Sequence, residues 1–179
     1  MKTKVIIFIF LFLTFKSFSQ ELIDTSGNFT SQNSTVYWTH KFEKIFTFQD
    51  LLISVKKAGI LNNIDIFQNT IVGQSVESFM DYRGAGFTRM STPIILSNSS
   101  YKSFVTIENF SDGYIVTVKK ITFINQNDTK QISPLFGSAQ GEITPIEAIA
   151  IKKTGKFTNS FLNQAAKIID FTLKKNYTF

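Results

Sequence analysis

The side chains that most often carry out chemistry in proteins are scarce in this chain. It contains no cysteine and a single histidine, His40. This excludes disulfides, thiolate chemistry, thiolate zinc sites and multi-histidine metal sites. A Ser-His-acid triad would have to use His40, but that residue falls in an expected strand beside Lys41, with no serine motif in reach. A surface histidine is the better interpretation.

The carboxylates are few and dispersed. Glu108 and Asp112 flank an expected hairpin turn, and a solvated turn explains them better than paired acid–base catalysis does. Asp65, Glu77 and Asp81 would lie near one sheet edge and bind calcium there, but their spacing does not resemble a calcium-binding loop. We therefore expect no enzyme, no catalytic residue, no metal and no cofactor.

The strongest candidate for recognition is the segment 81–89, DYRGAGFTR. Its two glycines loosen the loop but lack the further glycine or helix pattern that a phosphate-binding loop needs. Aromatic and guanidinium side chains suit stacking and contacts with carboxylates or sugars. The candidate binding residues are Tyr82, Arg83, Phe87 and Arg89. The alternative is an ordinary loop that joins two strands and turns its cations outward.

The length and composition are those of one ordinary globular domain. The chain has 179 residues, of which 43% are hydrophobic and 20 are phenylalanine, enough for a substantial core. Its formal charge of +6 would suit nucleic acid or an anionic membrane. Three of the lysines lie in an N-terminal leader, so the remainder carries 6 − 3 = +3. Because the other lysines are scattered in pairs, we interpret them as solvated surface and expect no nucleic-acid partner.

The leader, residues 1–19 (MKTKVIIFIFLFLTFKSFS), has the layout of a secretory signal peptide. Lys2 and Lys4 precede an apolar run, and small residues stand at the −3 and −1 positions of an expected cleavage between Ser19 and Gln20. The run is about ten residues long, whereas a membrane span needs roughly 20. A short N-terminal membrane anchor is the alternative. We expect an exported protein, periplasmic or secreted, with no stable membrane span after cleavage.

The elements that would position the candidate residues follow from hydrophobic periodicity. The polar residues 20–34 predict a flexible segment. Alternation over 35–42 predicts a strand, with Trp38, the only tryptophan, as a core anchor. A helix then starts at the capping residue Thr47, carries an apolar stripe and ends at Gly59.

A long β-hairpin over Tyr101–Ile124 is the centre of the predicted domain. Asp112-Gly113 supplies the positive φ that a tight turn needs. In the second arm, the residues expected to face inward change from even-numbered to odd-numbered positions at Lys119-Lys120. A β-bulge would cause such a change. The residues expected to face inward are Tyr101, Ser103, Val105, Ile107, Tyr114, Val116, Val118, Ile121 and Phe123.

The remaining elements complete one layered domain. Segments 64–67 and 70–80 predict two strands joined by a short turn, and 81–100 predicts two strand ends with a loop between them. An amphipathic helix is predicted over 157–175. Residues 35–179 are therefore a single α+β domain: one antiparallel sheet in the order β-α-β4-α, with the helices packed on one face.

This order, with the residues that fill it, resembles a family of secreted bacterial domains of unknown function with a TATA-binding-protein-like fold. The similarity runs from about Thr35 to Asn125. It includes the strand with Trp38, the helix Thr47–Gly59 and the hairpin return DGYIVTV. The chain departs from the family in Asp81–Ser100, which is longer and richer in glycine. The resemblance implies a fold and a compartment but no activity, and DNA binding does not follow from the fold name.

Two functions are compatible with these observations. The first is a non-enzymatic binding or interaction domain for an unknown protein or envelope component, which would expose an apolar or aromatic patch. The second is a carrier of a small apolar ligand, because a curved sheet gripped by a long helix can enclose a cavity lined by phenylalanines. A hydrolase is retained only as a residual class. Oligomeric state and ligand are not encoded in any recognisable motif.

Overall fold

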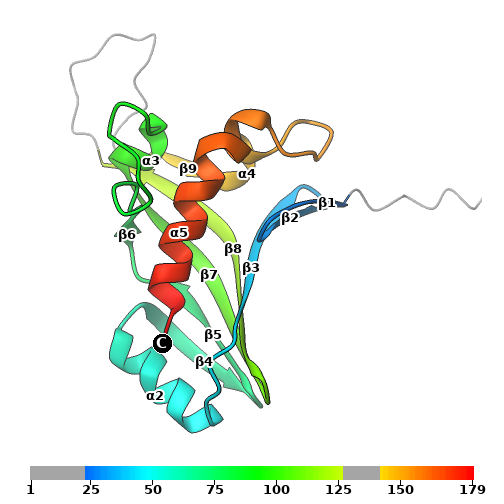
Figure 1. Cartoon of the computed structure of the whole chain (residues 1–179), viewed down its shortest axis with the longest axis vertical. Helices are drawn as coiled ribbons and strands as arrows, with labels where there is room; N and C mark the ends of the chain where they lie inside the picture. Colours follow the sequence, from blue (N-terminus) through cyan, green and yellow to red (C-terminus); the bar gives the residue numbers. More distant parts are fainter. Residues whose placement is uncertain (1–22, 127–141) are drawn as a thin grey trace, which may run out of the picture.

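The computed structural model describes residues 23–126 and 142–179, which form one antiparallel sheet with helices against it (Figure 1). The sheet has nine strands in the order β1-β2-β3-β8-β7-β5-β4, with β6 pairing with β7 and β9 with β8. The strands are β1 (Ile23–Ser26), β2 (Phe29–Gln32), β3 (Thr35–Phe42), β4 (Leu61–Phe67), β5 (Thr70–Ser75), β6 (Ser78–Phe79), β7 (Ser99–Phe110), β8 (Gly113–Asn125) and β9 (Ile143–Pro145). The helices are α2 (Phe48–Ala58), α3 (Ile94–Asn98), α4 (Ile146–Ala150) and α5 (Ala166–Tyr177).

The predicted central hairpin is confirmed as β7 and β8, which are paired from Ser99–Asn125 down to Phe110–Gly113. Gly113 has a φ of 140°, and a Cβ there would lie 2.1 Å from the carbonyl oxygen of Phe42. Glycine is therefore required because β3 passes so close to the turn. The bulge is confirmed too, since the register shifts beside Lys120, whose φ is 53°.

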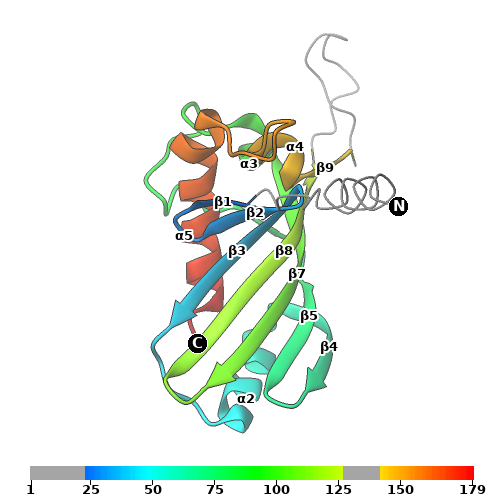
Figure 2. The same cartoon turned by 90° about the vertical axis from the view of Figure 1, so that its right-hand side faces the viewer.

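The alternation of the hairpin divides the sheet into a helix-covered face and an uncovered face (Figure 2). All nine residues predicted to face inward are buried. On that face α5 lies along the sheet, and the hydroxyl of Tyr114 joins the two layers: it donates to the carbonyl of Tyr177 at 2.8 Å and accepts from the N–H of Phe179 at 3.1 Å. The core lies between the sheet and the helices, and its buried residues come from α2, α3, α4 and α5 as well as from the strands.

The N-terminal part of the described chain differs from its prediction. The flexible segment expected over residues 20–34 is wrong from residue 23 on, because β1 and β2 form an antiparallel hairpin that extends the sheet from β3. Phe29 is buried in the core and stacks edge-on against Phe161, with ring centroids 5.3 Å apart. One well-buried aromatic residue holds a segment whose other residues are mostly polar.

The first helix agrees with its prediction. Thr47 caps α2 by accepting a hydrogen bond from the N–H of Asp50 at 3.2 Å, and Gly59 ends the helix with a φ of 63°. Leu51, Leu52 and Val55 form its buried stripe. In Figures 1 and 2, α2 lies on the same side of the sheet as α5, below it.

The C-terminal helix was predicted as one element over 157–175 but begins later. A π-helical turn over Phe161–Ala165 precedes α5, and the side chain of Thr158 accepts from the N–H of Phe161 at 3.1 Å. Phe157 instead bridges to Ile151 as a short piece of β-structure. The helix is nonetheless amphipathic as predicted, and its buried residues are Ala166, Ile168, Ile169, Thr172, Leu173 and Tyr177.

The predicted order β-α-β4-α is too simple, although a single antiparallel sheet in an α+β domain is correct. Two strands precede the expected first strand, and β5 stops at Ser75 before a separate short strand, β6. The segment 81–100 contains a short helix, α3, and Ser99 and Ser100 already belong to β7. The predicted leader and its cleavage point at Ser19 lie outside the described residues.

Candidate functional site

A pocket of about 160 Å³ lies on the helix-covered face, where the ends of α2 and α5 approach the bend between β5 and β6. Its walls are Gly59, Ile60, Ser75, Val76, Ser78, Tyr101, Asn176 and Tyr177. The ladder between β5 and β7 ends at Gln74 and Phe104; beyond it the N–H of Ser103 donates to the side chain of Ser75 at 2.8 Å, and the N–H of Val76 donates to the carbonyl of Ile60 at 2.8 Å. The pocket is thus a consequence of an interrupted strand beside the end of a helix.

The two tyrosines of the pocket are neutral hydrogen-bonding groups. Burial raises the pKa of Tyr101, and its hydroxyl accepts from the amide of Asn176 at 2.8 Å. Burial also raises the pKa of Tyr177, and proximity to Tyr101 adds to the rise. The hydroxyl of Ser103 partly offsets that rise in the pKa of Tyr177 but makes no well-formed hydrogen bond. These phenols stay protonated at neutral pH, so they suit binding rather than proton abstraction.

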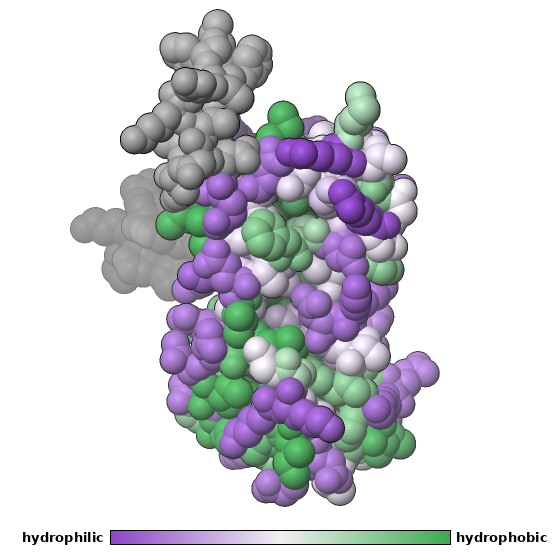
Figure 3. All heavy atoms as spheres, turned by 90° about the vertical axis from the view of Figure 1, so that its left-hand side faces the viewer, coloured by the Kyte–Doolittle hydropathy of each residue, from purple (hydrophilic) through white to green (hydrophobic). Residues whose placement is uncertain are grey.

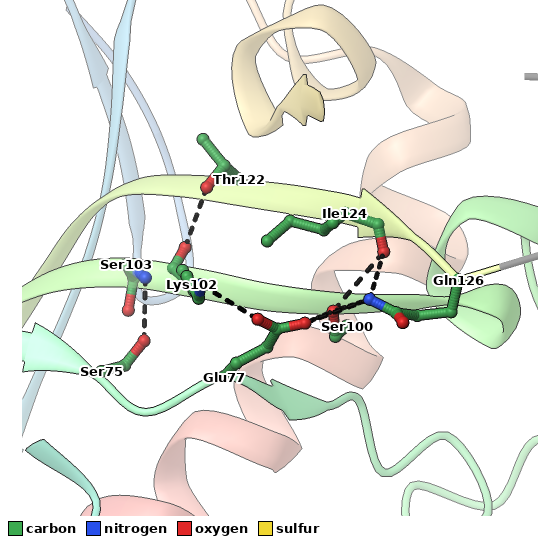
Figure 4. Close-up of polar contacts among 8 residues, drawn as sticks. All are labelled: Ser75, Glu77, Ser100, Lys102, Ser103, Thr122, Ile124 and Gln126. Carbon is green, nitrogen blue, oxygen red and sulfur yellow. Dashed lines mark hydrogen bonds and ion pairs between the residues drawn. The ribbon is translucent and has the colours of Figure 1, made fainter. Parts of the chain in front are cut away.

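A second polar cluster surrounds Glu77, which lies between the pocket-lining residues Val76 and Ser78 (Figure 4). Its carboxylate accepts from the hydroxyl of Ser100 at 2.5 Å and from the amide of Gln126 at 3.0 Å, and it pairs with Lys102 at 2.9 Å. The hydrogen bond from Ser100, and next those from Lys102, hold the pKa of Glu77 below its ordinary value. A carboxylate so fully engaged is a weak base, and the cluster fastens β6, β7 and β8 together.

The sole histidine lies in a third cluster, between β3 and α5. The carboxylate of Asp170 accepts from the indole N–H of Trp38 at 2.9 Å and the amide of Asn28 at 2.6 Å, and pairs with Lys174 at 2.9 Å. The Nδ1 of His40 lies 3.3 Å from the amide oxygen of Asn28. Burial, and then the charge of Lys174, lower the pKa of His40.

His40 is half-exposed, so the prediction of a surface histidine is only partly right, and polar side chains gather around the imidazole. They do not build a triad, because Asp170 is engaged by Trp38 and Asn28 and no serine hydroxyl is hydrogen-bonded to the imidazole among the described residues. The cluster ties the β1–β2 turn and β3 to α5.

The four candidate binding residues of segment 81–89 do not form one surface. The aromatic rings of Tyr82 and Phe87 turn inward and pack against the core. Arg83 and Arg89 are exposed, and the guanidinium of Arg89 reaches Asn98 at 3.4 Å. The alternative interpretation, a connecting loop with outward cations, describes this geometry better.

That loop has a fixed shape. The carboxylate of Asp81 accepts from the N–H of Gly84 at 2.8 Å and pairs with Lys175 at 2.7 Å. The ion pair with Lys175, followed by the hydrogen bond from Gly84, lowers the pKa of Asp81. A Cβ at Gly84 would lie 2.7 Å from the ring of Phe171, so this glycine permits close packing of the loop on α5.

Metal binding finds no support in the part of the chain that the structure describes. No group of three or more His, Asp or Glu side chains there is arranged to hold an ion. Asp65, Glu77 and Asp81 do not gather as such a group; Glu77 pairs with Lys102 and Asp81 with Lys175. Within residues 23–126 and 142–179, no helix combines the length and the apolar character that crossing a bilayer requires.

Two adjacent exposed apolar residues end β4, the last strand in the strand order of the sheet. Figure 3 shows hydrophobic residues gathered over the lower part of the helix-covered face, where α2 and β4 lie. Ile66 is 45% exposed on the helix-covered face, beside the half-buried Ile60 and Ile64, whereas the neighbouring Phe67 is 62% exposed on the other face of the same strand. We call these four residues the β4 surface. A strand was predicted here over residues 64–67, but no sequence pattern indicated that it lies at the edge of the sheet.

Comparison with models of protein families and with curated proteins finds no match for this chain. Among solved structures, the chain is similar to a TBP-like protein from Parabacteroides distasonis, with a TM-score of 0.46 and 13% sequence identity. The match covers 81% of this chain and 92% of that chain. The neighbour has the fold name that the sequence resemblance implied; membership of the secreted family and export of the chain remain predictions.

Proposed function

We propose that the chain is an exported, non-enzymatic binding domain that recognises a protein or envelope component through the β4 surface. The observation that supports this is the contrast between that surface and the polar clusters. The carboxylates of Glu77 and Asp170 are engaged by neighbouring donors, so neither has the free, basic carboxylate that catalysis needs. Adjacent exposed apolar side chains on a strand at the sheet edge favour an interaction site instead.

The carrier hypothesis has less support. A pocket of about 160 Å³ is well below the roughly 300–1,000 Å³ typical of small-molecule sites. The space between the sheet and α5 is filled by Trp38, Tyr114 and Tyr177, all buried. The observed pocket would hold about five waters at ~30 Å³ each, which is too little room for an acyl chain.

Recognition through the β4 surface is tested by photo-crosslinking in the cells that produce the protein. A benzophenone amino acid replaces Phe67 in one variant and Phe171, a partly exposed residue of α5, in a matched control. We expect a discrete crosslinked species from position 67 and none from position 171. Equal crosslinking at both positions, or none at position 67, would show that the β4 surface is not the binding site.

Export is tested separately by the mass of the protein recovered from the envelope and the medium. The expected mature chain begins at Gln20. A protein that retains Met1 and stays with the cytoplasmic fraction contradicts the exported part of the proposal while leaving the binding surface untouched.

A further inference from the structure

The β4 strand has one strand neighbour, β5, in the described sheet, so its other edge is open. Phe67 pairs with Thr70 across a two-residue turn, in which Gln68 has a φ of 52°. In such a closing pair, the N–H and C=O of each residue bond to the C=O and N–H of the other. Hydrogen-bonded and non-hydrogen-bonded pairs then alternate along the two strands. Phe67 and Asp65 therefore turn their backbone groups toward β5, whereas Ile66 turns its N–H and C=O toward the open edge.

The side chains along this edge divide between the two faces of the sheet. Ile66 stands opposite the buried Ile71 and so belongs to the helix-covered face, as does the half-buried Ile64. Asp65 and Phe67 project from the uncovered face. Natural edge strands are commonly protected by lysine, proline or a bulge. Here a bulge disrupts only the start of β4, where Asn63 has a φ of 50°, and Ile64–Phe67 carry neither lysine nor proline.

A second copy of this chain fits the edge poorly. If two β4 strands paired antiparallel around Asp65, the two aspartates would stand directly opposite each other, and like charges in that position are destabilising. If the centre moved to Ile66, Ile64 would face the turn residue Gln68, and the regular ladder would shrink to about three residues. Asp65 thus opposes self-pairing and favours a strand that brings a positive charge to the same place.

From this geometry we infer that β4 binds an extended segment of a partner protein as an additional strand, with an apolar–basic–apolar pattern. The backbone of that segment pairs with Ile66, its two apolar side chains pack beside Ile64 and Ile66 on the helix-covered face, and its lysine or arginine meets Asp65 on the other face. This inference rests on the proposed function, because it names the class of partner that the β4 surface takes. Main-chain pairing supplies affinity in such complexes, and the alternating side chains supply specificity.

The probes are two capped hexapeptides, TVKVTV and its charge-reversed counterpart TVEVTV, titrated into ¹⁵N-labelled protein. We expect TVKVTV to bind saturably with a Kd below about 1 mM and to shift the amide resonances of Ile64 to Phe67, that of Ile66 most. TVEVTV should bind about fivefold more weakly, the scale expected for one exposed charge pair made attractive or repulsive.

Two variants sharpen the test. Asp65→Lys should reverse the preference between the peptides, because the charge that selects the partner is inverted. Ile66→Pro removes an N–H that is not used within the sheet, so the fold should persist, as its amide spectrum will show, while peptide binding is lost. If Ile66→Pro fails to fold, Asp65→Lys still decides the question.

The inference is overturned by equal binding of both peptides, by shifts that lie away from β4, by no binding of either peptide, or by an unchanged preference in Asp65→Lys. Amide shifts in β4 that depend on protein concentration alone would also overturn it, by making a second copy the occupant. A discrete crosslink from position 67 combined with any of these results would preserve the proposed function and reject only the added strand.

Discussion

The two edges of the sheet are built in opposite ways. At one edge, the β1–β2 hairpin is fastened to the helical layer: Asp24 accepts from the N–H of Phe157 at 2.7 Å, Asn28 donates to Asp170 at 2.6 Å, and Phe29 stacks on Phe161. At the other edge, β4 has β5 as its strand neighbour, and the last two residues of β4, Ile66 and Phe67, are exposed. The two edge strands also differ in length, since β1 has 4 residues and β4 has 7.

The comparison shows where apolar surface is buried within the domain and where it stays exposed. The anchored edge has its single phenylalanine buried and polar side chains bonded across long sequence distances, although Ile23 at the start of β1 is 57% exposed. The open edge keeps Ile66 and Phe67 in solvent, although their burial would be favourable at ~25 cal/mol per Å². The following predictions test whether the two edges differ in energy as they do in geometry.

The largest difference is expected between the phenylalanines of the two edges. Phe29→Ala removes a buried ring and should lower the free energy of unfolding by about 3–5 kcal/mol. Phe67→Ala removes an exposed ring and should change it by no more than about 0.5 kcal/mol. Urea denaturation of both variants measures the contrast, and similar losses would mean that the edges do not differ as described.

The aspartates of the two edges come next. Asp170→Ala leaves the indole N–H of the fully buried Trp38 without its acceptor and Lys174 without its partner. We expect a loss of about 2 kcal/mol in the free energy of unfolding. Asp65→Ala, the control at the open edge, should stay within about 0.5 kcal/mol. An Asp170→Asn variant that is as unstable as Asp170→Ala would show that charge, rather than the acceptor, matters at this position.

The anchored edge should also weaken in acid. Burial alone would raise the pKa of Asp170, but hydrogen bonds from Asn28 and Trp38 and the pairing with Lys174 outweigh it, so the pKa lies below its ordinary value. A carboxyl with a depressed folded pKa stabilises the fold above its unfolded pKa of about 4 and loses that contribution as the pH falls through the folded value.

Denaturation of the wild type and Asp170→Asn between pH 7 and pH 3 measures this contribution. The stability difference between them should be constant above about pH 5 and shrink below pH 4. Because the amide side chain of the variant cannot titrate, a difference that is independent of pH would assign the effect to hydrogen-bond geometry alone.

The parts of the fold that the sequence predicted rest on short-range signals. The alternation of β3 and of the hairpin β7–β8, and the caps Thr47 and Gly59, are local patterns, and the structure confirms them. The β1–β2 hairpin was missed because Phe29 is its only large buried residue. A local signal was present in Gly27-Asn28, a pair that suits a two-residue turn and in which Gly27 has a φ of 59°.

The candidate site was less predictable, because it depends on which helix face meets which strand. Tyr101 and Tyr177 are 76 residues apart (177 − 101) and line one pocket because α5 ends beside β7. Trp38 was correctly predicted to be buried, yet its partner Asp170 is on a helix whose pairing with β3 no local pattern encodes. Tyr82 and Phe87 are predicted binding residues whose rings pack against the core, an orientation that the sequence does not indicate, because an aromatic on a glycine-rich loop has the same sequence pattern whether it turns outward or inward.

The smallest expected effect on stability concerns Ile66 itself. Ile66→Thr keeps a β-branched side chain, which suits a strand, and removes apolar atoms from a side chain that is already 45% exposed. The free energy of unfolding should fall by less than about 1 kcal/mol, whereas binding of the TVKVTV peptide should weaken severalfold, because the lost surface is the surface that the partner strand covers. A variant in which stability falls sharply and peptide affinity does not change would reverse the comparison: it would make Ile66 a core residue of this domain, and the open edge an anchored one.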